Sequence, residues 1–419
     1  MTGLGASPWS AHLETTVLPW WERHAVDDEL GGVFTCFDNR GRLLSHDKYT
    51  WSQGRWAWVC AELAEAAARG EVAVDGPLWS DRATRTAAFL VERSATPDAR
   101  TAFVTDRAGA HQPSGPDGEV STSVFADLFA VLGIAGGSRA AREEGDERVA
   151  PWLDAASRML LVAERSIADR TARTEPYPVP AGYRDLAGPM TLVHVADELA
   201  RAGGGAPAEG VRDRALSALL DDGGMLGATT WAEFRADAGP AGTMLDRHRT
   251  PGHLLECLWM IVHAQERARR PVGADRLAAL ATRALEIGWD DEHGGLLRYC
   301  DEAGGPPRGT LLAPGEPGRY EQLVLDTWDT KLWWVHAEAM YATELLARIS
   351  GSAELTTWHE RVAEYTLATF PDRERGEWIQ VRARDGRPLD RVVALPVKDP
   401  FHIIRALLLL ARGTAPAPA

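Results

Sequence analysis

The stretch TPGHLLECLWMIVHAQE, from Thr250 to Glu266, is apolar on almost every side and still carries polar residues along one line. Its leucine, tryptophan, isoleucine and valine residues recur at helical spacing, which predicts a helix in the protein interior. His253, Glu256 and His263 are separated by three and seven residues, so they share one face of that helix.

The helical pattern recurs along the chain and alternates with a second kind of segment. Apolar residues at helical spacing mark the stretches 51–70, 123–141, 189–202, 254–270, 275–289, 331–350, 358–370 and 401–412. Short apolar runs, mostly led by glycine and often followed by turn residues, begin near 31, 101, 223, 294 and 376. Such runs are typical of small β-hairpins. The hairpin-like runs return roughly every 70 residues, or at a multiple near that, which indicates an internal repeat.

One repeat holds two helices and one hairpin-like connection, and about six repeats fit into the 419 residues. Six helix pairs in a ring form an all-α (α/α)6 barrel, in which the inner helices surround a central cavity. An open superhelix of helix pairs is the alternative. The ring is favoured because several helices carry polar residues on an otherwise apolar inner face. With no long linker visible, we expect a single domain over residues 1–419, with its core from about residue 15 to residue 412.

Composition and charge narrow the classes of partner. The formal net charge is −15, from 45 Lys and Arg against 60 Asp and Glu, which argues against nucleic-acid or anionic-membrane binding. The N-terminus lacks the basic and apolar regions of a signal peptide, and no apolar run reaches the length of a membrane span. The four cysteines are scattered, without metal or disulfide spacing. We therefore expect a cytoplasmic protein that acts on a small, neutral ligand.

Four of the predicted helices carry a histidine near their start, within apolar surroundings. These are His194, His253, His336 and His402. One buried histidine is usually structural, but four at equivalent helix ends predict a shared pocket. Glu256 lies three residues after His253, where its carboxylate could hold the imidazole in one tautomer and raise its basicity.

The helix at 51–70 adds a further wall to the predicted pocket. Trp51, Arg55 and Trp58 follow one another at steps of four and three and share a face. A guanidinium is always charged, so Arg55 needs acceptors, either from a ligand or from a carboxylate in a structural ion pair.

Two histidines facing one cavity suit a particular chemistry. They could remove and return a proton at one carbon from two sides, provided that a neighbouring carbonyl acidifies that carbon. An arginine could stabilise the enolate oxygen. This is epimerisation, or aldose–ketose isomerisation when the proton returns to the adjacent carbon. A glycosidase would instead need two opposed carboxylates, and the chain holds enough acidic residues to keep that alternative open.

Five blocks of the sequence resemble the N-acylglucosamine 2-epimerase family in order and approximate spacing, from about residue 20 to residue 410. The blocks are DKYTWSQGRWAW (47–58), TPGHLLECLWMIVH (250–263), KLWWVHAEAMYA (331–342), RVAEYTLATFPDRERGEW (361–378) and VKDPFHIIRALL (397–408). The fold implied by the resemblance is again the (α/α)6 barrel. The implied acid/base pair is His253 and His402, with Glu256 supporting His253.

The resemblance also implies a set of substrate-binding residues. Arg55 would bind the sugar near its carbonyl oxygen, and Trp334 would meet the sugar ring. His194 resembles an additional histidine of cellobiose 2-epimerases and mannose isomerases, which keeps a sugar without an N-acyl group as an alternative substrate. The full predicted binding set is Arg55, His194, Trp334, Trp51, His336 and Arg405.

The function that the sequence predicts is a sugar 2-epimerase of the N-acyl-D-glucosamine/N-acyl-D-mannosamine type. An aldose–ketose isomerase acting on D-mannose, D-fructose or a related sugar is the alternative, followed by a cellobiose 2-epimerase or an (α/α)6 glycosidase. A non-catalytic sugar-binding protein would not need two candidate bases. We expect no metal and no cofactor, since the chemistry requires none and the chain has no phosphate-binding GxxxxGK[ST] loop. The family suggests a homodimer.

Overall fold

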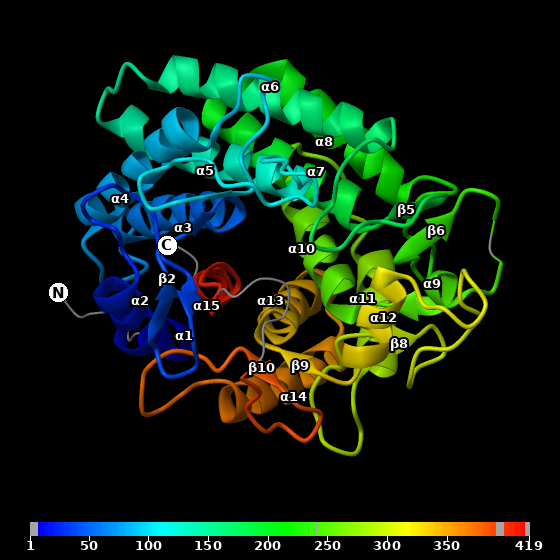
Figure 1. Ribbon diagram of the computed structural model, residues 1–419. Helices are drawn as coiled ribbons and strands as arrows, with labels where there is room; N and C mark the ends of the chain where they lie inside the picture. The colour runs from blue at the N-terminus through cyan, green and yellow to red at the C-terminus, as the bar shows by residue number, and fades with distance from the viewer. Residues whose placement is uncertain (1–6, 240, 391–397, 415–419) are drawn as a thin grey trace.

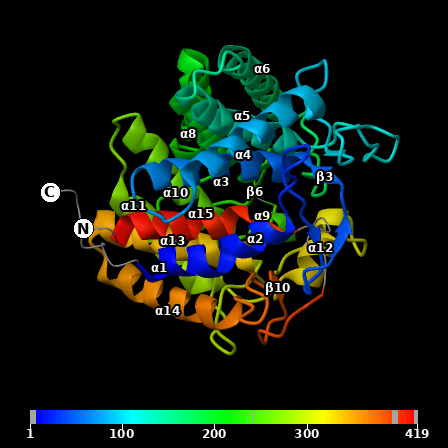
Figure 2. The ribbon, with the colours of Figure 1, turned by 90° about the vertical axis from the view of Figure 1, so that its left-hand side faces the viewer.

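The computed structural model describes residues 7–239, 241–390 and 398–414 (Figures 1 and 2). The α-helices are α1 (Pro8–His12), α2 (Leu18–His24), α3 (Thr50–Ala68), α4 (Gly76–Phe89), α5 (Val124–Glu143), α6 (Val149–Ala168), α7 (Ala187–Leu199), α8 (Gly205–Leu220), α9 (Met244–Arg247), α10 (Pro251–Arg267), α11 (Ala274–Gly288), α12 (Arg319–Thr327), α13 (Trp333–Ser350), α14 (Ala353–Thr369) and α15 (Phe401–Thr414). Three π-helical turns extend them, namely η1 (Leu13–Val17), η2 (Leu90–Ser94) and η3 (Ala200–Gly204).

The strands are short. They are β1 (Cys36–Phe37), β2 (Leu43–Ser45), β3 (Lys48–Tyr49), β4 (Val104–Thr105), β5 (Tyr183–Asp185), β6 (Phe234–Ala236), β7 (His248–Arg249), β8 (Cys300–Asp301), β9 (Lys331–Leu332) and β10 (Val381–Arg382). All of them belong to two-stranded antiparallel ladders.

The helices form two concentric layers around one axis (Figure 1). In the inner layer α3, α5, α7, α10, α13 and α15 pack each on the next, and α15 returns to pack on α3. The outer layer consists of α1 with η1 and α2, then α4, α6, α8, α11 and α14, each packed on the inner layer. Because α15 contacts α3, the ring is closed, and the (α/α)6 barrel predicted from the repeat is confirmed while the open superhelix is excluded.

The inner helices are buried on all sides because each has neighbours to its left, right and outside. α5 illustrates this burial. Its length and mean hydropathy of 1.4 would also suit a membrane span, although Asp127 and Arg139 interrupt its apolar sequence. In the ring, however, 89% of that apolar window is buried inside the protein. Its position as an inner helix therefore accounts for its composition.

The hairpin-like runs form local pairings and, in four repeats, also a second pairing that the sequence does not predict. Within their own runs Thr105 bridges His111 and Arg382 bridges Pro388. A local hairpin forms between β1 and β2, where Cys36 pairs with Ser45. In the other four repeats the run pairs with the residues that precede the inner helix of the same helix pair, giving β3 with β4, β5 with β6, β7 with β8 and β9 with β10. A helix pair brings its own start and end together, so these distant segments become the nearest available strand partners.

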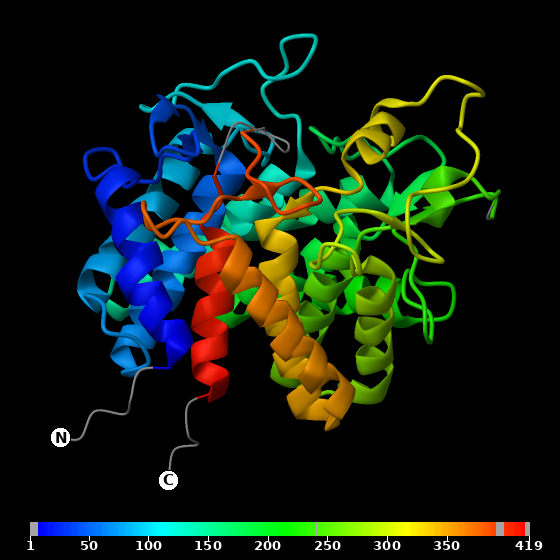
Figure 3. The ribbon, with the colours of Figure 1, turned by 90° about the horizontal axis from the view of Figure 1, so that it is seen from below.

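These ladders place the starts of the inner helices at one end of the ring. We call the end that carries β3 to β10 the hairpin mouth. A second, smaller hydrophobic cluster covers part of it, formed by Tyr183, Phe234, Met244, Leu245, Tyr299, Tyr320 and Val324. Figure 3 shows the hairpins at one end of the ring, whereas α1 begins and α15 ends at the opposite end.

The inner helices α3 and α5 approach each other closely at two glycines. A Cβ atom added to Gly54 in α3 would lie 1.8 Å from the carbonyl oxygen of Phe129 in α5. A Cβ atom added to Gly133 would lie 2.6 Å from the Cα atom of Gly54. The two backbones are therefore in contact, and this contact sets the spacing of α3 and α5 in the ring.

We expect the substitution Gly54→Ala to lower the free energy of unfolding by about 3 kcal/mol or more, because backbone atoms would have to move to admit one methyl group. Gly210→Ala in the outer helix α8 is the matched control. The nearest atom to its new methyl group is the end of the flexible Arg214 side chain, and alanine there should stabilise the helix by about 0.5–1 kcal/mol. Urea denaturation of both variants measures the difference, and equal effects would contradict the close contact.

Candidate active site

A cavity of about 210 Å³ opens at the hairpin mouth, lined by the first turns of inner helices and by residues of the hairpins. Six of the nine residues that the sequence predicts for the site lie on its wall. They are Trp51, Arg55, His253, Glu256, Trp334 and His402. They come from α3, α10, α13 and α15, so the ring brings together side chains that are up to about 350 positions apart in the sequence.

The carboxylate partner of His253 is Glu233 and not Glu256. The Nδ1 atom of His253 lies 2.6 Å from Oε1 of Glu233, a distance at which its N–H donates to the carboxylate. Glu233 stands beside the ladder strand β6, and its side chain is nearly fully buried. The prediction that Glu256 orients His253 was therefore wrong as to the hydrogen bond, which Glu233 makes, while the charge of Glu256 still acts on the imidazole.

The surroundings of His253 favour its protonated form. Burial alone lowers the pKa of this imidazole, but the negative charge and hydrogen bond of Glu233, helped by Glu256, outweigh burial and raise the pKa above its usual value. With Nδ1 engaged by Glu233, Nε2 remains available to the cavity. The ring packs on Trp334 at a centroid distance of 5.3 Å.

His402 has a carboxylate partner on a different inner helix. Its Nδ1 atom lies 2.5 Å from Oε1 of Glu338 in α13. The same carboxylate accepts hydrogen bonds from Arg405, one turn further along α15, and from the indole Nε1 of Trp259 at 2.7 Å. His402 also packs on Trp334 at a centroid distance of 5.8 Å, so one tryptophan contacts both pocket histidines.

Glu338 stays ionised in spite of complete burial. Burial raises the pKa of this carboxyl group, but Arg405 and His402 outweigh burial and lower the pKa to about 2. Because the folded-state pKa lies below the usual value, the stability contributed by the ionised form is present at neutral pH and is lost as the pH falls towards 2. A permanent carboxylate at Nδ1 leaves Nε2 of His402 as the free nitrogen.

Arg55 forms the ion pair that the sequence left open. Its Nη1 atom lies 3.0 Å from Oδ2 of Asp399, and the guanidinium lies 4.0 Å from the ring centroid of Phe129. The same Asp399 oxygen lies 3.5 Å from Nε2 of His402, while its Oδ1 accepts the backbone N–H of Phe401 and caps α15. Arg55 thus faces the cavity beside His402 without being free of the protein.

Glu256 contributes a carboxyl group to the cavity wall. Among the described residues it makes no hydrogen bond, and its one ion-pair contact is with Nδ1 of His402 at 3.9 Å. Burial and the charge of Glu338 raise its pKa above the usual value. A second cavity carboxyl, Asp185, has a pKa raised to about 6, chiefly by burial. Asp185 can therefore be neutral under mildly acidic conditions and donate a hydrogen bond.

Three predicted binding residues do not line the cavity. Arg405 is buried behind His402, where it binds Glu338. His336 faces the outer layer: its Nδ1 bonds to the carbonyl of Leu332 at 2.8 Å, and its ring stacks on Tyr365. Burial lowers the pKa of His336 to about 3, so its role is structural.

His194 lies too deep in the ring to reach the cavity. It is the eighth residue of α7, whereas His253 is the third residue of α10, so His194 lies about 8 Å further along its helix. Trp58 and Trp259 enclose its ring at centroid distances of 5.5 and 5.1 Å. Burial lowers its pKa to about 4. The prediction of four histidines around one pocket therefore holds for two of them.

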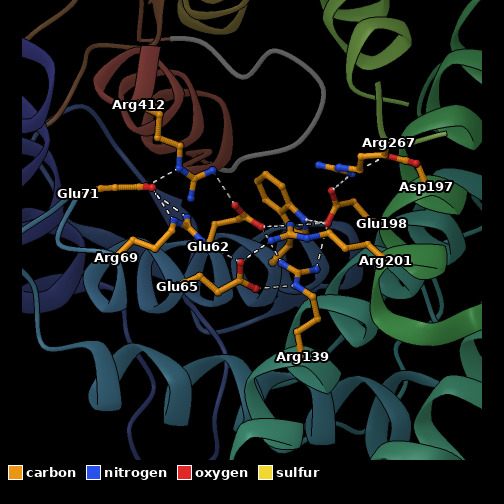
Figure 4. A network of polar contacts seen from close by, with 11 residues as sticks. Glu62, Glu65, Arg69, Glu71, Arg139, Asp197, Glu198, Arg201, Arg267 and Arg412 are labelled. Carbon is orange, nitrogen blue, oxygen red and sulfur yellow. Dashed lines mark hydrogen bonds and ion pairs between the residues drawn. The ribbon is translucent and has the colours of Figure 1, made fainter. Parts of the chain in front are cut away.

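His194 borders a second cavity of about 310 Å³ near the opposite end of the ring. Figure 4 shows the ion pairs around it, which link α3, α5, α7, α10 and α15. Arg139 contacts both Glu62 and Glu198 at 2.7 and 3.0 Å, and Arg412 contacts Glu62 at 3.0 Å. Arginines near the C-terminal ends of helices also complement the helix dipoles. This network closes the end of the ring that lies away from the hairpin mouth.

One set of donors has the composition of a metal site. Donor atoms of Glu256, Glu338 and His402 all lie within 4.8 Å of one another. The guanidinium of Arg405, however, already binds Glu338 and places a permanent positive charge beside it. That charge opposes a cation, so the donor set does not fit a metal ion well.

Sequence reasoning did not single out Glu233, Asp185, Arg298 and Asp399, which also line the cavity. Glu233 and Arg298 belong to the hairpin-like runs at 223 and 294, and Asp399 precedes α15. A comparison of equivalent positions among the runs could have identified Glu233, which is a charged residue near the end of an otherwise uncharged run.

We expect Glu338→Gln to lower the free energy of unfolding by about 3 kcal/mol or more, since it leaves the buried guanidinium of Arg405 without a counter-ion. Glu256→Gln removes the charge of a neighbouring buried carboxyl that lacks such a partner, and should change it by less than about 1 kcal/mol. Urea denaturation at neutral pH compares the two. Similar losses would show that Glu338 is not the anchor of this cluster.

Comparison with known proteins gives relatives along nearly the whole chain. The N-acylglucosamine 2-epimerase of Bos taurus is 28% identical over 399 residues, covering 94% of this chain and 87% of the bovine chain. The enzyme of the same name from Homo sapiens is 28% identical over 413 residues, covering 96% and 90%.

Solved structures share the fold. Cellobiose 2-epimerase from Bacillus thermoamylovorans B4167 superposes with a TM-score of 0.73 at 17% identity, covering 96% of this chain and 98% of the other. A D-mannose isomerase superposes with a TM-score of 0.72 at 14% identity, covering 98% and 99%. The family model described as N-acylglucosamine 2-epimerase matches residues 31–406. The protein therefore belongs to the N-acylglucosamine 2-epimerase family and is an isomerase.

Proposed function

We propose that the protein is a sugar 2-epimerase that interconverts N-acyl-D-glucosamine and N-acyl-D-mannosamine by means of two histidines. One observation carries the proposal: His253 and His402 come from different inner helices, each binds a carboxylate through Nδ1, and both line one cavity. Membership of the N-acylglucosamine 2-epimerase family supports the reaction type.

The reaction begins with the open-chain sugar, whose C1 carbonyl acidifies the proton at C2. One imidazole takes that proton through Nε2, and the electron pair moves into an enolate with its charge on the C1 oxygen. Arg55, on the cavity wall beside His402, is the cation placed to stabilise that oxygen. The second histidine, as an imidazolium, then returns a proton to the opposite face of C2. The aldehyde re-forms with inverted configuration.

The surroundings of the two histidines suit them to different roles, one as the acid and the other as the base. The raised pKa of His253 favours its protonated form, which suits the step that returns a proton to C2. The Glu338 carboxylate fixes His402 in the tautomer with a free Nε2, which suits a base. In the reverse direction the roles exchange, as microscopic reversibility requires.

The position of His194 supports the N-acyl substrate over the isomerase alternative. The likeness of His194 to the additional histidine of other superfamily members was the sequence argument for a sugar without an N-acyl group. Its ring is enclosed by Trp58 and Trp259, outside the cavity that holds His253. This removes the residue-level support for that alternative.

We expect His253→Asn and His402→Asn each to fold normally and to lose roughly 10²-fold or more in turnover, the scale of a lost general acid or base. The measurement is proton NMR in deuterium oxide, which follows the loss of the C2 proton of N-acetylmannosamine and the appearance of its epimer. His293→Asn, on the surface next to Glu292, is the matched control and should retain full activity.

Several outcomes would contradict the proposal. Near-normal rates in either pocket variant would exclude the two-histidine mechanism. Parallel samples with mannose and cellobiose test the substrate: a ketose product with deuterium at C1 would make the protein an aldose–ketose isomerase. Release of free sugar from a glycoside, without C2 exchange, would make it a glycosidase.

Replacing Glu233 with Gln should shift the pH dependence of turnover. The carboxylate raises the pKa of His253, so its removal lowers that pKa and leaves His253 protonated only at lower pH. The limb of the pH–rate profile that reports His253 should therefore move to lower pH in both reaction directions. Glu256→Gln is the comparison, since it leaves the Glu233 hydrogen bond in place. An unshifted limb in Glu233→Gln would show that His253 does not titrate in the reaction.

A further inference from the structure

Arg298 is a buried cation on the cavity wall whose side chain donates to neither a carboxylate nor a backbone carbonyl of the described residues. Seven arginines are buried in the described part of the chain, and six of them donate to a carboxylate or to a backbone carbonyl. These six are Arg82, Arg139, Arg212, Arg249, Arg382 and Arg405. Arg298 donates to the phenol oxygen of Tyr177 at 3.2 Å, and no carboxylate of the described residues lies within 4 Å of it. The remaining stretches of the chain contain no Asp or Glu.

The position of Arg298 is fixed by the backbone. The N–H group of Arg298 donates to the carbonyl of Thr330 at 3.0 Å, and its neighbours Leu297 and Tyr299 are held in the same way. The guanidinium lies 5.0 Å from the ring centroid of Tyr299 and 5.9 Å from that of Tyr177. The rings and phenol groups of Tyr177 and Tyr299 thus hold the guanidinium at the cavity, and two neutral acceptors leave part of its five N–H donors for a ligand.

Arg298 occupies a position that recurs in the repeats, and at two of its five occurrences, Glu233 and Arg298, the side chain lines the cavity. In five repeats a single bridge joins a residue shortly after an outer helix to a residue of the following hairpin-like run. Two positions after that bridge the chain holds Thr35, Phe103, Glu233, Arg298 or Gln380. Glu233 binds His253, and Gln380 binds the Asp399 that pairs with Arg55. Arg298 is the charged member of this set whose partners in the site, Tyr177 and Tyr299, are neutral.

The other charges of the cavity are already engaged or distant. Glu233 binds His253, and Asp399 binds Arg55. Glu256 and Asp185 remain more than 4 Å from Arg298, since they form no ion pair with it. Burying an unpaired guanidinium is costly, and a planar fork of N–H donors matches two oxygens of one oxyanion.

We propose that Arg298 forms a subsite that binds an anionic oxygen group of the substrate, either a carboxylate or a phosphate. The epimerase acts on a sugar that carries this group away from C2. The inference rests on the proposed sugar-binding function of the same cavity and narrows its substrate class. A guanidinium merely hydrated by cavity water would give no preference for an anionic sugar, which makes the two cases distinguishable.

The test is a binding measurement on the full-length protein, followed by tryptophan fluorescence because Trp51 and Trp334 line the cavity. The ligands are N-acetylmannosamine, its 6-phosphate, and the corresponding sugar with a carboxylate at C6. At least one anionic ligand should bind roughly 10-fold or more tightly than the neutral sugar, the scale of a charged hydrogen-bonded contact. The ligand that shows the advantage identifies the oxyanion.

Arg298→Gln and Arg298→Met should abolish the advantage, measured in each variant as the ratio of its affinities for the anionic and the neutral sugar. The methionine variant keeps an unbranched stem against the two tyrosine rings, in case glutamine impairs folding. Arg308→Gln is the matched control, because it removes the same charge from an exposed position of the same connection. It should keep the advantage of the anionic ligand.

Equal affinities for neutral and anionic sugars in the unmodified protein would overturn the inference, as would an advantage that persists in both Arg298 variants. The comparison of ligands on the unmodified protein decides the matter even if neither variant folds. C2 exchange in deuterium oxide is measured separately. A protein that prefers anionic sugars without exchanging the C2 proton would refute the proposed function and retain the subsite.

Discussion

The carboxylate of Glu338 is the group on which the arrangement of the centre depends. It lies on α13 and accepts hydrogen bonds from His402 and Arg405 on α15 and from Trp259 on α10. An isolated charge could not remain ionised at this depth, and neither could the guanidinium of Arg405, so each makes the burial of the other possible. Glu338 also stands between the two cavities, because His402 lines the first and Trp259 the second. The carboxylate of Glu338 thus both orients His402 and separates the two cavities inside the ring.

The layered fold could be predicted from the sequence because inner and outer helices leave different patterns. All six inner helices were recognised, since helices such as α5 are apolar on every side. The outer helices α4, α6 and α8 were not singled out, because much of each faces solvent and its apolar stripe is narrow. The runs were predicted as local hairpins, and those near 101 and 376 do fold back on themselves, but the second pairing that four of the runs make with a distant segment was not predicted. That pairing joins segments that become neighbours only after a helix pair has formed, and no local signal records it.

The candidate site was predictable in position and less so in its contacts. Helical spacing placed His253 and His402 near helix starts, and the structure puts both at the cavity. The same spacing suggested Glu256 as the partner of His253, but the imidazole turns to Glu233 on another segment. Partners contributed by other elements depend on three-dimensional packing, so they cannot be recognised from the spacing of residues in the sequence. His194 was misplaced because its depth along the helix was not considered. It lies five positions further into its helix than His253 does, which moves its side chain from the cavity wall into the interior.

The described chain starts at α1 and finishes at α15 on the face of the ring opposite the hairpin mouth (Figure 3). A resin, a fluorescent reporter or a second enzyme joined to either terminus would therefore approach the face closed by the arginine–glutamate network, and the cavity would stay open to solution. Two partners attached at once would meet on that same face and crowd one another. Tethering through a single terminus is thus the geometry that this architecture accommodates best.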